Sequence, residues 1–263
     1  MLFNSYTFLL VFLPLAVLGF QLLRHAPRAA AFAWLVAASL FFYGYWNPIY
    51  LPLVIGACTV NFFLGEYLSR HQGTQRAKWV LAGGVTANLL LLGYYKYTGF
   101  LQVVIGEVTG TTPDWAKVVL PLGISFFTFQ KIAYLVDASR GRTKEYRFLD
   151  FLLFVFFFPQ LIAGPIVHHG EIMPQFRKKF PWGTFKRDFA IGLGILALGL
   201  FKKVVVADRL SSIASPLFDL AGSGSRHLTM AEAWTAAVSY SLQLYFDFSG
   251  YTDMAIGAAR FFG

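Results

Sequence analysis

Residues Phe148–Val167 read FLDFLLFVFFFPQLIAGPIV, a run in which Asp150 is the single charged side chain. A helix needs roughly 20 mostly apolar residues to cross a hydrocarbon layer about 30 Å thick. Further apolar runs of this kind fill most of the chain: Ser5–Leu23, Ala29–Tyr45, Tyr50–Leu68, Trp79–Tyr95, Val118–Val136, Phe189–Val206 and Met230–Phe262. The pattern predicts an all-α polytopic membrane protein.

The composition supports this class. Hydrophobic residues make up 57% of the 263 positions and charged residues only 13%, about half the usual share in soluble domains. So few charges could not cover a water-soluble globule of this size. A soluble enzyme, a disordered chain and a secreted disulfide scaffold are therefore excluded. Cys58 is the one cysteine, and we expect it to be a small apolar packing residue.

The net charge of +9 does not indicate nucleic-acid binding, because the basic residues lie in short loops between apolar runs. Fourteen of the 22 Lys and Arg residues lie in the loops 24–28, 70–78, 140–147 and 177–187. The alternate loops 46–48 and 96–117 carry none and two. The positive-inside rule places the basic loops in the cytoplasm. This predicts a multi-pass membrane protein whose amino terminus faces the outside.

Basic loops flank the run Phe148–Val167 on both sides, so both of its ends are expected in the cytoplasm. Its interior contains Pro159 and Gly164-Pro165, where a helix loses backbone hydrogen bonds. Non-helical backbone is tolerated at membrane depth only inside protein or beside a cavity. The run therefore predicts a re-entrant hairpin, with a kinked ordinary span as the alternative.

Asp247 and Asp253 lie in the last apolar run, which is longer than one span and is either a continuous tilted helix or one broken at Gly250. Six helical positions turn about 600°, so the two carboxylates point to different sides of an unbroken helix. They form no acid/base couple unless the helix breaks. They are either partners for Lys or Arg on neighbouring helices or functional groups.

Gln130 and Asp208 are the other candidate site residues. Gln130 interrupts an apolar run together with Lys131, and it either makes an interhelical hydrogen bond or lines a polar passage. Asp208 follows Lys202-Lys203 and precedes Arg209, a group that is either ordinary interface charge or part of a site. The five histidines show no metal-binding spacing, so we expect no metal site.

Several longer motifs are more specific than any single residue. They read LPLGISFFTFQ at 120–130, FPQLIAGPI at 158–166 and LYFDFSGYTDMAIG at 244–257, with LFNS at 2–5 and WNP at 46–48. In this order the motifs resemble the membrane-bound O-acyltransferase (MBOAT) family, closest to its bacterial alginate-acetylating branch. The resemblance covers residues 1–263.

The resemblance implies a ring of about seven to eight transmembrane helices and a re-entrant segment around a central funnel. It implies acetyl transfer from a cytoplasmic donor, acetyl-CoA, across the inner membrane for the O-acetylation of an exopolysaccharide such as alginate or cellulose. The expected partners are the lipid bilayer, a periplasmic SGNH-type acetyltransferase and, indirectly, the polysaccharide. No bound cofactor and no nucleic acid are expected. Asp208 matches an acidic position of the alginate branch, while Asp247 and Asp253 match their motif without an assigned role.

The family's catalytic histidine lies in a Trp-His segment beyond the last of these motifs. None of the five histidines matches it, so the sequence resembles the amino-terminal half of the domain, and these residues alone are expected to be inactive. Two other functions stay open. One is a secondary transporter or polysaccharide-export component, with Asp247 and Asp253 as coupling-ion ligands. The other is a non-catalytic scaffold or relic.

Overall fold

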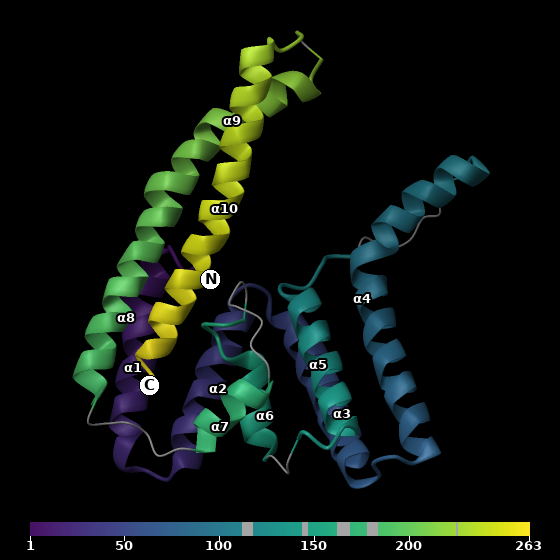
Figure 1. Cartoon of the computed structure of the whole chain (residues 1–263), viewed down its shortest axis with the longest axis vertical. Coiled ribbons are helices and arrows are strands. Elements are labelled where there is room, and N and C mark those ends of the chain that lie inside the picture. Colours follow the sequence, from purple (N-terminus) through teal and green to yellow (C-terminus); the bar gives the residue numbers. More distant parts are fainter. Residues whose placement is uncertain (112–117, 144–146, 162–168, 178–183, 225) are drawn as a thin grey trace. The chain divides into compact units, whose positions relative to one another are not determined.

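A computed structural model of the chain describes residues 1–111, 118–143, 147–161, 169–177, 184–224 and 226–263. The described residues form helices joined by short turns (Figure 1). Two compact units are present. Unit 1 contains residues 1–26 and 180–263, and unit 2 contains residues 27–162 and 166–179, with a short stretch at 163–165 assigned to unit 1.

Unit 2 consists of six α-helices and one short 3₁₀ turn, η3 (Pro48–Tyr50), among its described residues. The helices are α2 (Arg28–Gly44), α3 (Leu51–Arg70), α4 (Gln75–Thr109), α5 (Ile124–Ser139), α6 (Phe148–Phe156) and α7 (His169–Arg177). Aromatic rings fill much of its core, as in the contact between Tyr134 and Phe151, whose ring centroids lie 4.6 Å apart. Asn61 and Asn88 are buried and exchange amide hydrogen bonds between α3 and α4. Cys58 is fully buried, as expected.

The predicted break after Phe156 is present. Helix α6 ends there, and Phe157 adopts a non-helical ψ of 107°. The backbone N–H of Phe158 donates to Ser39 Oγ on α2 at 3.1 Å, so a neighbouring helix satisfies the freed donor at this depth. The second break, at Gly164-Pro165, lies outside the described residues, and the choice between a hairpin and a kinked span stays a prediction.

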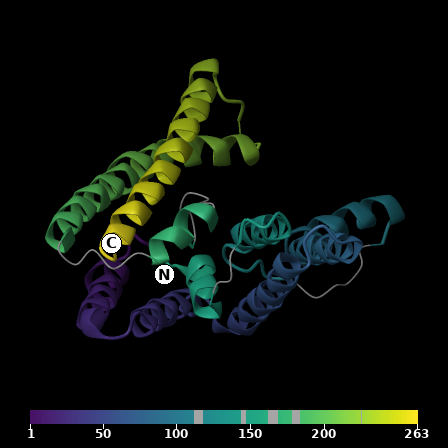
Figure 2. The same cartoon turned by 60° about the horizontal axis from the view of Figure 1, so that its bottom comes forward.

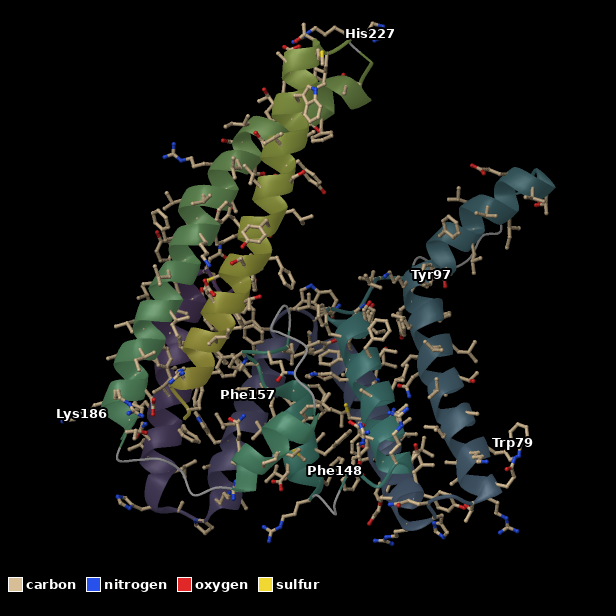
Figure 3. The ribbon with its side chains drawn as sticks, viewed as in Figure 1. Trp79, Tyr97, Phe148, Phe157, Lys186 and His227 are labelled. Carbon is tan, nitrogen blue, oxygen red and sulfur yellow. The ribbon has the colours of Figure 1, made fainter. Side chains whose placement is uncertain are left out.

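Two helices of unit 2 differ in length from the sequence prediction. Helix α5 begins at Ile124 rather than near Val118, because Pro121 lacks a donor and Gly123 takes a left-handed φ of 69°. Helix α4 continues past Tyr95 to Thr109 and bends near Tyr97, while Trp79 lies near its start (Figure 3). The Thr98 hydroxyl donates to the carbonyl of Tyr94 there, a contact that often bends helices.

Unit 1 begins with a π-helical segment, η1 (Thr7–Phe12), followed by α1 (Leu13–Leu22) and the 3₁₀ turn η2 (Leu23–His25). Its larger part is a continuous helical run made of α8 (Phe185–Leu200), the π-helical segment η5 (Phe201–Ala207) and α9 (Asp208–Gly222). Helix α10 (Met230–Arg260) returns antiparallel to this run. We call residues 185–260 the helical hairpin, and its two arms lie side by side in Figures 1 and 2.

The hairpin differs from the prediction in one arm. The sequence predicts that the helix ends where the apolar run Phe189–Val206 ends, but the helix continues to Gly222. The other arm has no break at Gly250, so the continuous alternative for the last run is confirmed. By length and apolar composition, Pro48–Arg70 and Phe185–Gly222 are long enough to cross a membrane, and Thr7–Leu22 and Arg28–Gly44 are shorter apolar helices. The predicted ring around a funnel involves both units and stays a prediction.

Candidate functional site

The two arms of the hairpin touch through glycine. Gly192 and Gly199 on α8 face Gly257 and Gly250 on α10, and a Cβ atom added to any of them would meet backbone of the other arm at 2.6 to 2.8 Å. Small residues of this kind let membrane helices approach until their backbones touch. We call these four residues the glycine seam. The seam holds the following segment of one arm, η5, directly against α10.

Lys202 and Lys203 lie in η5, where the backbone hydrogen bonds are of the π type. In a regular α-helix, residues five apart are about 140° apart around the axis. The i→i+5 bonding of a π-helix instead places residue i+5 above residue i. The local π geometry therefore brings Asp208 onto the same side as Lys203, five positions earlier.

Lys203 joins two carboxylates. Its Nζ lies 3.0 Å from Asp208 Oδ1 on the same arm and 2.5 Å from Asp247 Oδ1 on α10. Lys202 contacts α10 at a second point, where its Nζ donates to Asp253 Oδ2 at 2.6 Å and to Ser249 Oγ at 3.0 Å. Asp247 and Asp253 thus point to different lysines, as expected for positions six apart on an unbroken helix.

The positive and negative charges of this group do not cancel. We call Lys202, Lys203, Asp208, Asp247 and Asp253 the lysine–aspartate network, which contains two cations and three carboxylates. The side chain of Lys203 is 20% exposed, whereas those of Asp208 and Asp247 are 46% and 41% exposed. The network therefore carries one surplus negative charge, and its two most accessible carboxylates share one ammonium. Such a group can accept a proton or a hydrogen bond from a hydroxyl.

The hairpin carries a second ion pair near its other end. Asp188 is largely buried and lies 3.4 Å from Arg260 across the arms, and the Thr184 hydroxyl donates to the same carboxylate at 2.5 Å. Figure 3 shows Lys186 at this end and His227 at the opposite end. The sequence analysis did not single out Asp188 or Ser249. Ser249 lies within an apolar run and Asp188 directly precedes one, and a polar group at such a position is the signal that could have identified them.

Gln130 belongs to unit 2 and is considered apart from the network. It is 8% exposed on α5, and within the described part of the chain its side chain makes no hydrogen bond. The interhelical hydrogen bond considered from the sequence is therefore not present among those residues. Its neighbour Lys131 is 2% exposed, and no carboxylate in the described ranges pairs with it.

Metal-ligating side chains do not gather within the described ranges. No group of three or more His, Cys, Asp or Glu residues there could hold a metal ion. His71 and His227 lie at a helix end and in a loop, and His25 ends η2. His168 lies outside the described residues, and the side chain of His169 is not described.

Comparison with known proteins indicates a family for this chain. The model of the membrane-bound O-acyltransferase family matches residues 65–263. Peptidoglycan O-acetyltransferase of Helicobacter pylori (strain ATCC 700392 / 26695) is 43% identical over 289 residues, which cover 100% of this chain and 54% of the relative.

Two further relatives have lower sequence identity to this chain. A protein described as a probable alginate O-acetylase AlgI from Pseudomonas aeruginosa is 36% identical over 271 residues, covering 100% of this chain and 50% of the relative. Teichoic acid D-alanyltransferase of Bacillus subtilis (strain 168) is 25% identical over 215 residues, covering 80% of this chain and 52% of the relative. The chain spans about half the length of the curated relatives it matches.

Proposed function

The chain belongs to the membrane-bound O-acyltransferase family, and from that membership we propose that it takes part in acetyl transfer across a membrane to a polysaccharide hydroxyl. The donor in this proposal is cytoplasmic acetyl-CoA. The acceptor side is the periplasm, where an SGNH-type acetyltransferase receives or uses the acetyl group. Because one relative is a peptidoglycan O-acetyltransferase and another a probable alginate O-acetylase, we add peptidoglycan to the expected acceptors, alginate or cellulose.

The observation that carries the proposal is the lysine–aspartate network on the hairpin. Ionisable groups within membrane-spanning helices are costly and usually functional. Here Lys203 holds Asp208 and Asp247 together while both carboxylates keep more than a third of their surface exposed. We assign Asp208 the role of accepting a hydrogen bond from the receiving hydroxyl, and Lys203 the role of holding that carboxylate in place.

The proton acceptor for the reaction is a separate question. The resemblance assigns it to a histidine in a segment that follows the last matched motif. Because the chain spans about half of its relatives, we propose that the remainder of the domain supplies this histidine. The network would then orient the acceptor hydroxyl while the histidine removes its proton. Gln130 is proposed to line the passage from unit 2.

The pairing pattern supports a transferase over an ion-coupled transporter. A coupling-ion site needs carboxylates with free ligand positions directed at one point. Asp247 and Asp253 instead contact Lys203 and Lys202 respectively. Each of these two carboxylates therefore already contacts a lysine ammonium, and the two are directed at different lysines rather than at one ion.

The test is polymer acetylation in cells that carry Asp208→Asn, with base-released acetate as the readout. We expect acetate to fall by about 10- to 100-fold, the effect of losing one hydrogen bond to a charged group, with membrane levels of the protein unchanged. Asp137→Asn is the matched control, because among the described residues the Asp137 side chain makes one ion pair, at 3.9 Å with Arg142 in unit 2. Wild-type acetylation in the Asp208→Asn strain would remove Asp208 from the site.

A further inference from the structure

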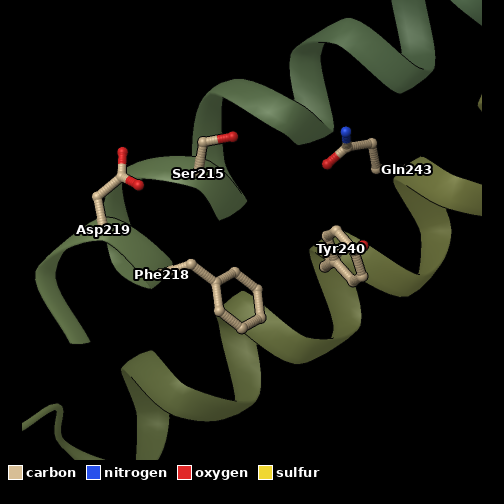
Figure 4. A pocket seen from close by; sticks show the side chains of 5 residues that line it. All are labelled: Ser215, Phe218, Asp219, Tyr240 and Gln243. Atoms are coloured by element: carbon tan, nitrogen blue, oxygen red, sulfur yellow. The ribbon is translucent and has the colours of Figure 1, made fainter. Parts of the chain in front are cut away.

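A cavity opens between the arms of the hairpin, next to the lysine–aspartate network. It has a volume of about 430 Å³, and its described lining consists of Ser215, Phe218 and Asp219 on α9 and Tyr240 and Gln243 on α10 (Figure 4). Volumes of this size are typical of small-molecule sites. Gln243 precedes Asp247 by four residues, or about 6 Å along a helix, so the cavity adjoins the network.

The cavity lies about 26–30 Å along α10 from Arg260, at the edge of a hydrocarbon layer that begins at that residue. Helix α10 has 31 residues, about 46 Å at 1.5 Å per residue, which exceeds a hydrocarbon layer of about 30 Å. The apolar part of the hairpin extends from the Asp188–Arg260 pair toward the network, so the far end projects beyond the hydrocarbon. Pro216 lies inside α9, and α9 bends in its second half (Figures 1 and 2), as expected where proline removes a helix hydrogen bond.

Two polar groups of the cavity, one buried and one exposed, have no hydrogen-bond donor among the described residues, whereas the Ser215 hydroxyl lies 3.4 Å from that of Ser211. Gln243 Oε1 is buried and has no hydrogen-bond partner, and the side chain of Asp219 makes no ion pair or hydrogen bond among the described residues. Figure 4 shows the Ser215 hydroxyl and the Gln243 amide pointing toward one another across the gap. The buried, unsatisfied Gln243 Oε1 calls for a ligand that donates, the exposed Asp219 carboxylate offers a second acceptor, and a ligand with several hydroxyl groups can reach both walls.

The remaining lining is aromatic. The rings of Phe218 and Tyr240 lie edge to face with their centroids 5.4 Å apart, and they offer an apolar surface to the C–H face of a sugar ring. No Lys or Arg is among the described residues that line the cavity. Since Asp219 adds a negative charge, the cavity disfavours a uronic acid.

We propose that this cavity binds a neutral sugar unit of the acceptor polysaccharide. The proposal rests on the proposed function, because it assigns the acceptor of that same transfer to a site beside the network. The cavity would also discriminate between acceptor polymers. A cavity with one carboxylate and no facing cation selects a polymer of neutral sugars, such as N-acetylated amino sugars, over a polyuronate.

The test measures binding of two oligosaccharides to the protein in nanodiscs by saturation-transfer difference NMR, without acyl donor. Chitotetraose is the neutral probe and tetramannuronate is the charged one. We expect binding of chitotetraose only, and at least about tenfold weaker binding in the variants Ser215→Ala and Gln243→Leu. Ser212→Ala is the matched control, because this hydroxyl lies on the same helix and donates only to the carbonyl of Arg209.

Equal chitotetraose affinity in all three variants would overturn the proposal, and so would a preference for tetramannuronate. Cavity-dependent binding of tetramethylammonium without sugar binding would identify a cation site and overturn it as well. Sugar binding and acetyl transfer are measured separately. Gln243-dependent sugar binding in a protein that transfers no acetyl group would contradict the proposed function alone, and transfer without such binding would contradict the sugar site alone.

Discussion

Gly199 and Gly250 face each other so closely that a Cβ atom on Gly199 would lie 2.7 Å from the carbonyl oxygen of Gly250. The obstructing atom is backbone, which cannot move aside as a flexible side chain can. Gly192 and Gly257 repeat this contact seven residues away on each arm. The register of the hairpin, and with it the position of η5 against α10, therefore depends on the absence of side chains at these positions.

Gly199→Ala is expected to lower the free energy of unfolding by about 1–3 kcal/mol, the usual cost of overpacking. Chemical unfolding in detergent, followed by tryptophan fluorescence, measures the loss. Gly194→Ala is the control, because nothing lies within 4 Å of a Cβ at that position of the same helix. Equal stability of the two variants would show that the arms do not meet at Gly199.

Lys203→Met is expected to destabilise the protein more than the double variant Lys203→Met/Asp247→Asn does. The single change leaves two carboxylates near each other without their shared cation, whereas the double change removes one of them. Because the carboxylates are partly exposed, the single change should cost about 1–2 kcal/mol. A double-mutant cycle of unfolding free energies measures the coupling, and additive effects would contradict the ion pair.

Lys131→Met is expected to raise the free energy of unfolding by about 1–3 kcal/mol, since a buried charge without a carboxylate partner is costly. The exposed Lys96 provides the control, and Lys96→Met should change stability by less than about 0.5 kcal/mol. Thermal unfolding in detergent compares the two variants. A loss of stability in Lys131→Met would mean that the folded protein supplies Lys131 with a partner.

Glu232 lies in the first turn of α10, at the end of the hairpin far from the Asp188–Arg260 pair. The side-chain hydrogen bond from Arg226, together with hydrogen bonds from Thr229, lowers the pKa of Glu232 from 4.5 to about 2. A depressed carboxyl pKa stabilises the fold above pH 4.5, and this contribution is lost as the pH falls from 4.5 toward 2.

Carbon-13 NMR of the Glu232 carboxyl carbon measures this pKa directly. We expect a titration midpoint far below 4.5 in the unmodified protein and a rise in Arg226→Gln, which removes the largest cause. The helix-capping contacts with Thr229 stay in that variant, so its midpoint should remain below 4.5. A midpoint near 4.5 in the unmodified protein would contradict the Arg226–Glu232 pair.

Particular residues show how far the sequence could predict this fold. The break after Phe156 was predictable because Pro159 removes a backbone donor, which is a local effect. The burial of Cys58 was also predictable, from the cost of exposing a small apolar group. The helix was expected to end near Val206, but it continues to Gly222. Beyond the apolar run, Lys202 and Lys203 find carboxylate partners on the same arm and on α10, so the helix can continue through these charges.

The candidate site was also only partly predictable from the sequence. Asp208, Asp247 and Asp253 could be selected from the sequence because a carboxylate near an apolar run is conspicuous. Their lysine partners could not be assigned, because Asp247 and Asp253 lie 44 and 51 positions along the chain from Lys203 and Lys202. The π-helical segment that aligns Lys203 with Asp208 has no signature in the apolar pattern.

The sequence by itself determined a membrane protein built from helices, since in lipid an apolar segment must satisfy its own backbone hydrogen bonds. It also determined the family, because several motifs occur in a fixed order. Only the tertiary structure decided which charges meet. That outcome depends on close backbone contact at the glycine seam and on a local change of helical pitch, and neither is a property of residue type alone.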